Sequence, residues 1–189
     1  QRRFAEAEQL LGEALSIRRR HQGTEHADIA VDLHGMGDAF LAQGKLAEAE
    51  QCFRDALAMR RKFMGEEGPG VANNLQSLGY TLKARGSLAA AEPVLRESLV
   101  MRRKLLGNEH RDVSTSLGSL GDLLRRLGRF AEAEVMLRES LAMDRTLPSG
   151  DHEDLATSLN NLGLVLDAQG KSAEAEVVLR QALTIKIKV

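Results

Sequence analysis

Apolar side chains recur along the chain at helical spacing, in a pattern that repeats every 42 residues. Within the stretch 71–106, Leu75, Leu78 and Leu82 follow one another at intervals of three and four, which predicts an amphipathic helix. A second apolar stripe follows after Gly86, so this stretch reads as a helical hairpin. The same interval separates Leu15, Leu57, Leu99, Leu141 and Leu183. A fixed period of this size, free of insertions and deletions, indicates a solenoid.

Two sets of glycines keep the same register. Those that follow the first helix of each hairpin are expected to end it as C′ residues, and they are Gly44, Gly86, Gly128 and Gly170. Those within the apolar stripe are expected to let the partner helix approach closely, and they are Gly37, Gly79, Gly121 and Gly163. The glycines therefore predict both the turns and the closest helix contacts.

The pattern predicts about nine helices and no sheet. First helices are expected at about 29–43, 71–85, 113–127 and 155–169. We divide the single array into an orphan second helix at 1–22 and hairpin repeats at 27–64, 70–106, 112–146 and 154–188. Because no hairpin can bury its apolar stripe alone, the fold class expected is all-α, a right-handed α-solenoid or superhelix.

The loops between repeats carry a recurring histidine followed by an acidic residue. Residues at the place of an N-cap are Asp28, Gly70, Asp112 and Asp154. The histidines are His26, His110 and His152, and equivalent ones are too far apart to share a metal ion. We therefore expect them to form loop hydrogen bonds, and we expect no metal. Basic runs at 18–20, 60–62 and 102–104 close the second helices and are interpreted as solvated helix ends, with a phosphate site as the alternative.

The overall charge and composition narrow the function classes. The formal net charge of −1 argues against nucleic acid as a partner. The charge is uneven: residues 45–86 and 87–128 carry +2 each, and residues 129–170 carry −5. No apolar run is long enough to span a membrane, and the lone Cys52 excludes an internal disulfide, which fits a cytoplasmic location. The start at Gln1, in mid-repeat, is typical of a piece of a longer protein.

At the repeated apolar and glycine positions of its hairpins, the chain resembles the tetratricopeptide repeat, in the 42-residue form of the kinesin light chain type. The matching segments are 99–107, 109–112, 159–163 and 169–176. The resemblance implies a protein-interaction fold whose first helices line a concave groove. Bacterial versions of the repeat are often appended to kinase or ATPase domains. The chain departs from the family in having no proline after the loop histidine, and in keeping the asparagine pair Asn160–Asn161 in the fourth unit alone.

A second stripe on the first helices, turned away from the core, would line that groove. The side chains of this stripe differ between units, while the core positions stay fixed. Such variation is expected of a surface that is specific for a partner. The predicted peptide-binding residues are His34, Asp38, Asn73, Gln76, Tyr80, Lys83, Thr115, Asp122, Arg125, Arg126, Asn160, Asn161, Leu164 and Asp167. A merely solvated face is the alternative for each of them. Tyr80, the single tyrosine, is the expected anchor.

These patterns favour a scaffold that binds a peptide segment of a partner protein, with an acidic peptide as a candidate. A regulatory or sensor array within a larger kinase- or ATPase-type enzyme, and a structural spacer or oligomerisation module, stay open. We expect no enzymatic activity, because the sequence has no phosphate loop, zinc signature or nucleophile elbow. We expect no cofactor, no nucleic acid and no membrane as partners. Terminal repeats with apolar side chains in contact with solvent could support self-association, and Val178, Leu179 and Ile185 are expected to be partly exposed.

Overall fold

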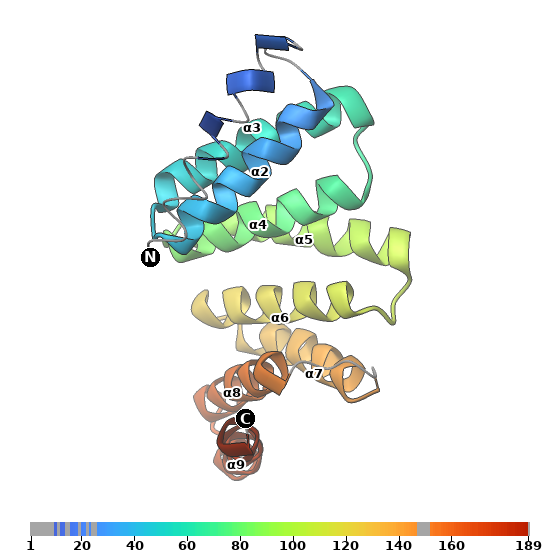
Figure 1. Cartoon of the computed structure of the whole chain (residues 1–189). Coiled ribbons are helices and arrows are strands. Elements are labelled where there is room, and N and C mark those ends of the chain that lie inside the picture. The colour runs from blue at the N-terminus through green and yellow to red at the C-terminus, as the bar shows by residue number, and fades with distance from the viewer. Residues whose placement is uncertain are drawn as a thin grey trace. The chain divides into compact units, whose positions relative to one another are not determined.

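The computed structural model describes residues 26–146 and 152–188, together with residues 10, 12, 13, 16–18, 20, 21 and 23. The described residues between 26 and 188 form helices and turns with no strand, so the all-α fold is confirmed there (Figure 1). The helices are α2 (Ala27–Ala42), α3 (Leu46–Met64), α4 (Pro69–Ala84), α5 (Leu88–Leu106), α6 (Arg111–Arg126), α7 (Phe130–Thr146), α8 (His152–Ala168) and α9 (Ser172–Lys188). The orphan helix predicted at 1–22 lies largely outside the described residues.

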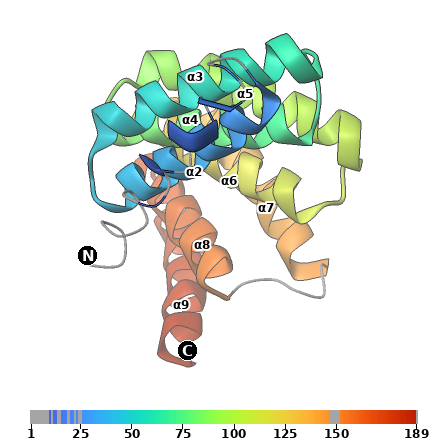
Figure 2. The same ribbon diagram turned by 45° about the horizontal axis from the view of Figure 1, so that its top comes forward.

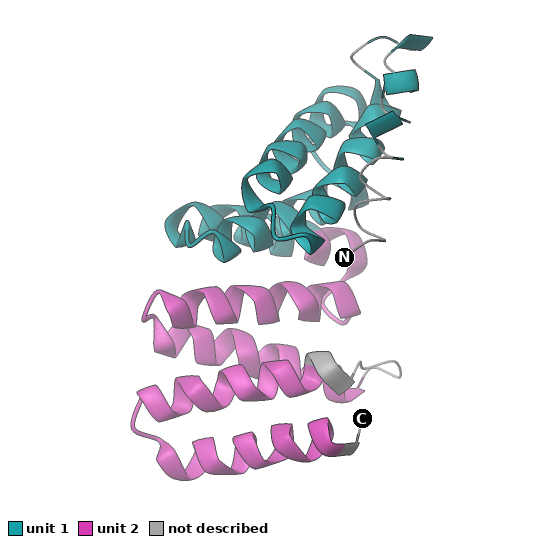
Figure 3. Cartoon of the chain, turned by 60° about the vertical axis from the view of Figure 1, so that its left-hand side comes forward, with its two compact units in different colours: residues 1–101 teal, residues 102–189 magenta. Residues whose placement is uncertain are grey.

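Consecutive helices pack as antiparallel hairpins, most plainly α8 against α9 (Figure 2). The chain divides into two compact units, unit 1 at Gln1–Met101 and unit 2 at Arg102–Val189 (Figure 3). The boundary falls within α5, and each unit is described by itself. We call the contact between a hairpin and the next one a seam, and we call residues 42 positions apart equivalent.

Each first helix ends in a Schellman turn. The glycine at C′ has a positive φ between 75° and 82° at Gly44, Gly86, Gly128 and Gly170. In the second hairpin the Gly86 N–H donates to the Lys83 carbonyl at 3.1 Å, and the Ser87 N–H donates to the Leu82 carbonyl at 2.9 Å. The prediction of C′ glycines is therefore confirmed. These turns fix where the second helix begins.

The helix starts correct the sequence-based assignment of the N-caps. His26 and His110 are the N-cap residues, and their Nδ1 atoms accept from the backbone N–H groups of Asp28 and Asp112 at 3.2 and 3.1 Å. The two aspartates lie in the first turn instead, where a carboxylate favours the positive end of the helix dipole. The loop hydrogen bonds expected of these histidines are confirmed.

The other two predicted N-caps are also wrong. Gly68 precedes α4 and Pro69 occupies its first turn, so Gly70 lies inside the helix. Proline suits that place, because the N–H that it lacks would have no partner within the helix. α8 begins at His152, which puts Asp154 inside it as well.

Glycines within the apolar stripe bring the two helices of each hairpin together. A Cβ atom added at Gly79 would lie 2.5 Å from a methyl carbon of Leu95, and one at Gly121 would lie 2.6 Å from Leu137. Gly37 faces Phe53 and Gly163 faces Leu179 in the same way. The close approach predicted from these glycines is confirmed. Around them Leu75, Leu78, Leu117 and Leu120 are almost completely buried and form the core of the hairpins.

Candidate functional site

The predicted stripe of α4 carries a half-exposed aromatic ring in unit 1. Tyr80 is 48% exposed, whereas Lys83 is only 7% exposed. The Lys83 ammonium lies 5.4 Å from the centre of the Tyr80 ring, within the range of a cation–π contact. Asn73, one turn before Gln76 on the same face, is exposed. The lysine therefore supports the tyrosine and is not extended into solvent.

His34 lies between helices of unit 1 and is only partly exposed. Its Nδ1 is 2.7 Å from the Asn74 side-chain oxygen, and the Asn74 amide nitrogen donates to the Phe53 carbonyl at 2.5 Å. Since an amide oxygen can only accept, the His34 Nδ1–H donates this hydrogen bond. The other ring nitrogen is 3.6 Å from Asp38, and burial raises the pKa of Asp38 although His34 opposes the rise. His34 therefore links α2 to α4.

Gln76 holds the position equivalent to His34 and also has a partner within the fold. The buried hydroxyl of Ser98, on α5, donates to the Gln76 side-chain oxygen at 3.5 Å and to the Ala72 carbonyl at 2.9 Å. Gly118 occupies the same position in unit 2, where an added Cβ atom would lie 3.4 Å from the hydroxyl of Ser158 on α8. This position therefore faces neighbouring helices as much as solvent.

Three predicted site residues of α6 form one cluster. The Asp122 carboxylate is largely buried and accepts from the guanidinium groups of Arg125 at 2.7 Å and Arg126 at 3.3 Å. Two positive charges are thereby reduced to a local net charge of +1. Thr115, two turns earlier, donates to the Arg111 carbonyl at 3.1 Å.

The predicted stripe of α8 presents an apolar side chain among polar ones. Leu164 is 43% exposed, and Asp167 is exposed one turn later. Asn160 and Asn161 are partly buried. In unit 2 the stripe therefore presents the apolar Leu164 on the same helix face as amide and carboxylate groups. We treat the stripe residues of unit 1 and those of unit 2 as two separate surfaces.

An arginine that sequence reasoning placed in solvent is buried in a seam. Arg102 is 6% exposed, and its guanidinium donates to the Asp112 carbonyl at 2.8 Å and to the Ser116 hydroxyl at 2.9 Å. The solvated helix end is therefore wrong for Arg102. At the equivalent position Arg18 forms ion pairs with Asp28 at 3.2 Å and Asp32 at 2.8 Å. The recurrence of arginine at this repeat position was the sequence signal that could have indicated a structural role.

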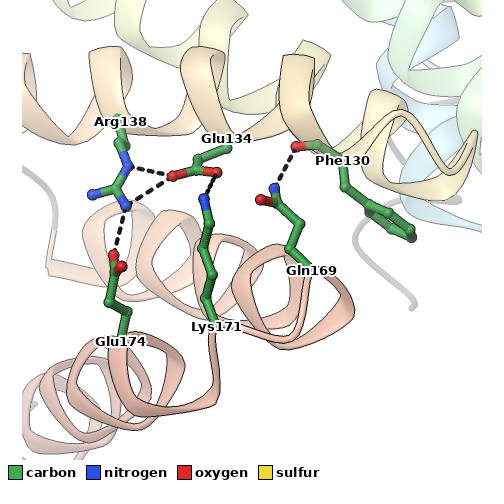
Figure 4. Close-up of polar contacts among 6 residues, drawn as sticks. All are labelled: Phe130, Glu134, Arg138, Gln169, Lys171 and Glu174. Atoms are coloured by element: carbon green, nitrogen blue, oxygen red, sulfur yellow. Dashed lines mark hydrogen bonds and ion pairs between the residues drawn. The ribbon is translucent and has the colours of Figure 1, made fainter.

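A second polar network lies near the hairpin turns of unit 2 (Figure 4). The Glu134 carboxylate on α7 accepts from Lys171 at 2.7 Å and from Arg138 at 2.8 Å, and Arg138 also reaches Glu174 of α9 at 2.9 Å. The Lys171 ammonium, followed by the Arg138 guanidinium, lowers the pKa of Glu134 to about 2. Lys171 therefore links the start of α9 to α7.

The equivalent glutamate in unit 1 is held in a similar way. Glu50 pairs with Arg54 on its own helix and with Arg85 at the turn of the next hairpin. Burial would raise the pKa of Glu50, but the hydrogen bonds from the two arginines outweigh it and the pKa is lowered. In unit 2 the Gln169 amide adds a bond to the Phe130 carbonyl at 3.1 Å (Figure 4). These networks stabilise the seams.

Family models now identify the repeat. A model described as the tetratricopeptide repeat matches residues 1–62, 70–146 and 144–188, and a second one of the same description matches residues 34–105. The chain belongs to the tetratricopeptide repeat family. Its hairpins are thus tetratricopeptide repeats of the kinesin light chain-like type, as their 42-residue period predicted. No curated protein sequence matches the chain significantly.

Solved structures share this tetratricopeptide fold. BtubC (BKLC) from P. vanneervenii is 26% identical, with 98% of this chain and 74% of that chain covered and a TM-score of 0.88. A putative kinesin light chain from Podosopora anserina with nearly identical TPR-like repeats is 24% identical, with coverages of 98% and 88% and a TM-score of 0.79. YrrB, described as a TPR protein with an unusual peptide-binding site, is 19% identical, with coverages of 94% and 78% and a TM-score of 0.67.

The tetratricopeptide repeat fold is typically that of a non-catalytic interaction scaffold. Among the residues that the structure describes, no three His, Cys, Asp or Glu side chains gather as a metal-ion site. Cys52 is buried in α3, and burial raises the pKa of its thiol. Within the described part, no helix combines the length and the apolar character needed to cross a membrane.

Proposed function

We propose that the chain is a non-catalytic interaction module that binds a peptide segment of a partner protein on the stripe of its first helices. The observation that carries the proposal is the half-exposed Tyr80 ring, which Lys83 supports. The opposite face of the same helix is buried in the core. An aromatic side chain held in place by its neighbour offers a large contact area at low entropic cost. Among tetratricopeptide structures, that of YrrB is described as having a peptide-binding site, which supports this class of function.

The groups around Tyr80 favour a peptide with an apolar anchor and hydrogen-bonding capacity. Asn73 and Gln76 lie on the same face of α4, and Asp38 is exposed on the neighbouring helix α2. In unit 2 the exposed Leu164 offers an apolar contact of its own. Because Arg125 and Arg126 share the Asp122 carboxylate, the pull of this cluster on an acidic peptide is that of about one positive charge. We propose that acidic side chains assist binding there, and that the anchor supplies most of the affinity.

The test is selection of binding peptides from a random library on the wild-type chain, followed by titration against variants. Tyr80→Ala should weaken the selected peptides by about 1–3 kcal/mol, in the range of interface hot spots. Tyr80→Phe keeps the ring and should retain most of the affinity. Val135→Ala is the matched control, since Val135 is 58% exposed on a second helix. If Tyr80→Ala binds the selected peptides as well as Val135→Ala does, the stripe is not the binding surface.

Charge is tested separately in unit 2. Replacing Arg125 and Arg126 by Glu should slow the association of acidic peptides and reduce its salt dependence. Asp122→Asn releases both arginines from their shared carboxylate and should have the opposite effect. Circular dichroism of each variant verifies that the helices persist. Selection of basic peptides by the wild-type chain would contradict this part of the proposal.

A further inference from the structure

An open hollow of about 370 Å³ lies in unit 2, where the end of α7 meets the start of α8 and the second half of α9. Its lining residues are Arg145, Leu155, Leu159, Arg180, Gln181, Thr184 and Ile185. Leu159, Leu155 and Ile185 provide an apolar floor, and two guanidinium groups stand at the rim. The hollow contains no residue of the predicted stripe, so it is distinct from the proposed peptide-binding stripe.

An ion pair occupies the equivalent place one repeat earlier. There the Arg103 guanidinium binds the Glu139 carboxylate at 2.5 Å, and in unit 1 the equivalent pair is Arg61 with Glu97. At the hollow, the position of the glutamate is taken by Gln181, whose neutral oxygen accepts from Arg145 at 3.4 Å. No carboxylate of the described residues forms an ion pair with Arg145. Among the described residues, the hollow therefore has the cation of the pair without a carboxylate opposite it.

A second position of the seam carries a different residue at the same end. Arg102 reaches from α5 to α6, but its equivalent on α7 is Asp144. Asp144 accepts from the Ser114 hydroxyl of its own hairpin. Near the hairpin turns, by contrast, Lys171 and Arg138 hold α9 to α7 (Figure 4). Near the turns the last hairpin is thus tied to α7 by charged contacts, and its other end borders the hollow.

We propose that this hollow binds a carboxylate side chain from a peptide segment of a partner protein, seated on Arg145 in the place that Glu139 fills one repeat earlier. An arginine–carboxylate contact is a strong, oriented hydrogen bond. An aliphatic residue next to the acidic one would cover Leu155 and Ile185 and remove apolar surface from water. Arg180 pairs with Glu176 at 2.6 Å and adds a weaker, exposed charge at the rim. The ligand class is therefore a glutamate flanked by aliphatic residues.

The experiment is a titration, followed by amide and methyl NMR, with the capped peptide acetyl-Ala-Leu-Glu-Leu-Ala-amide and its Gln counterpart at low ionic strength. The Glu peptide should shift the signals of Leu159 and of the Gln181 side-chain amide, and the Gln peptide should bind about tenfold more weakly, because it cannot make the charged hydrogen bond. Arg145→Gln should cause a similar loss. Arg103→Gln removes the equivalent arginine of the preceding seam, which already has Glu139 as its partner, and should leave the affinity unchanged.

Gln181→Glu supplies the missing carboxylate from within the chain and is the sharpest variant. It should lower the affinity for the Glu peptide about tenfold while the helix content and thermal stability are kept. The proposal is overturned if this variant binds as the wild type does, if both peptides bind equally, or if the wild type fails to bind up to about 5 mM. An equal loss in Arg103→Gln would overturn it too. Tyr80→Ala should leave this binding intact, which separates it from the proposed function.

Discussion

Replacing Glu134 by Gln should destabilise unit 2 by an amount that disappears in acid. The carboxylate accepts hydrogen bonds from Lys171 at 2.7 Å and from Arg138 at 2.8 Å, so glutamine keeps the shape of the side chain but removes its charge. The pKa of Glu134 is lowered from 4.5 to about 2. At about 1.4 kcal/mol for each tenfold change in acid dissociation, the full difference corresponds to about 3 kcal/mol.

Solvent reduces this upper limit. The Glu134 side chain is 14% exposed, but Lys171 and Arg138 are 41% and 49% exposed, and water screens pairs of that kind. Glutamine also retains one acceptor for either cation. We therefore expect Glu134→Gln to lower the free energy of unfolding by about 1 kcal/mol at pH 7.

The sign of the pH dependence follows from the lowered pKa. A carboxyl group whose pKa is lower in the folded state contributes its full stability above the unfolded value near 4.5, and it loses that contribution as the pH falls toward about 2. The difference between wild type and Glu134→Gln should therefore be constant from neutral pH down to about pH 5, and it should shrink to near zero by about pH 2. Subtraction removes the titration of the other carboxyl groups, which both chains share.

Urea unfolding followed by circular dichroism at several pH values measures this difference. Glu176→Gln is the matched control, because Glu176 has the same arginine four residues later but is 62% exposed and binds no residue of another described helix in an ion pair. It should cost less than about 0.5 kcal/mol. Equal losses in the two variants, or a Glu134→Gln deficit that persists at pH 2, would refute the assignment of the stability to the Lys171–Glu134–Arg138 contacts.

Three other predictions concern local packing. Gly121→Ala should cost about 1–3 kcal/mol in urea unfolding, because the added Cβ would lie 2.6 Å from Leu137. Gly118→Ala, whose added Cβ would have its nearest atom at 3.4 Å, should be neutral or stabilising. A larger loss in Gly118→Ala than in Gly121→Ala would contradict the close contact between Gly121 and Leu137. His110→Ala should cost about 1 kcal/mol and speed hydrogen exchange in the first turn of α6, whereas Asn at this position should restore most of the loss. Arg102→Met should lower the melting temperature through a loss of about 1–3 kcal/mol, since Ser116 and a carbonyl lose a buried donor; an unchanged melting temperature would mean that the guanidinium contributes nothing.

The helix framework was accessible from sequence because it depends on local rules. Positive φ at Gly86 and close approach at Gly79 each require a residue without a side chain, and the 42-residue interval repeats that requirement. The helix starts were less accessible, because His110 and Asp112 both suit a cap. Average preference favours the aspartate, but the histidine accepts through Nδ1 and moves the start by two residues.

The candidate site was predicted only in part, for a geometric reason. Spacing gives the angle of a side chain around its own helix, and it says nothing of the neighbour across the seam. His34 and Asp122 lie on the predicted stripe of their own helices, but Asn74 and Arg125 draw their side chains into packing contacts. Arg102 was missed because its acceptors, on the next hairpin, have no distinctive sequence signal. Whether the stripe binds a peptide stays a prediction.

The unlike seams of unit 2 have a consequence for the way such arrays change in evolution. Since all repeats have the same length, unequal recombination between two of them would add or delete a whole hairpin without disturbing a turn. Deleting the 42 residues 127–168, however, would bring Gln181 to the place of Glu139, opposite Arg103. The gene can exchange repeats freely only where the charges at the ends of the second helices happen to match. Repeats of one length can therefore be gained or lost without a change in the turns, but each such event creates a seam whose charges were not previously matched.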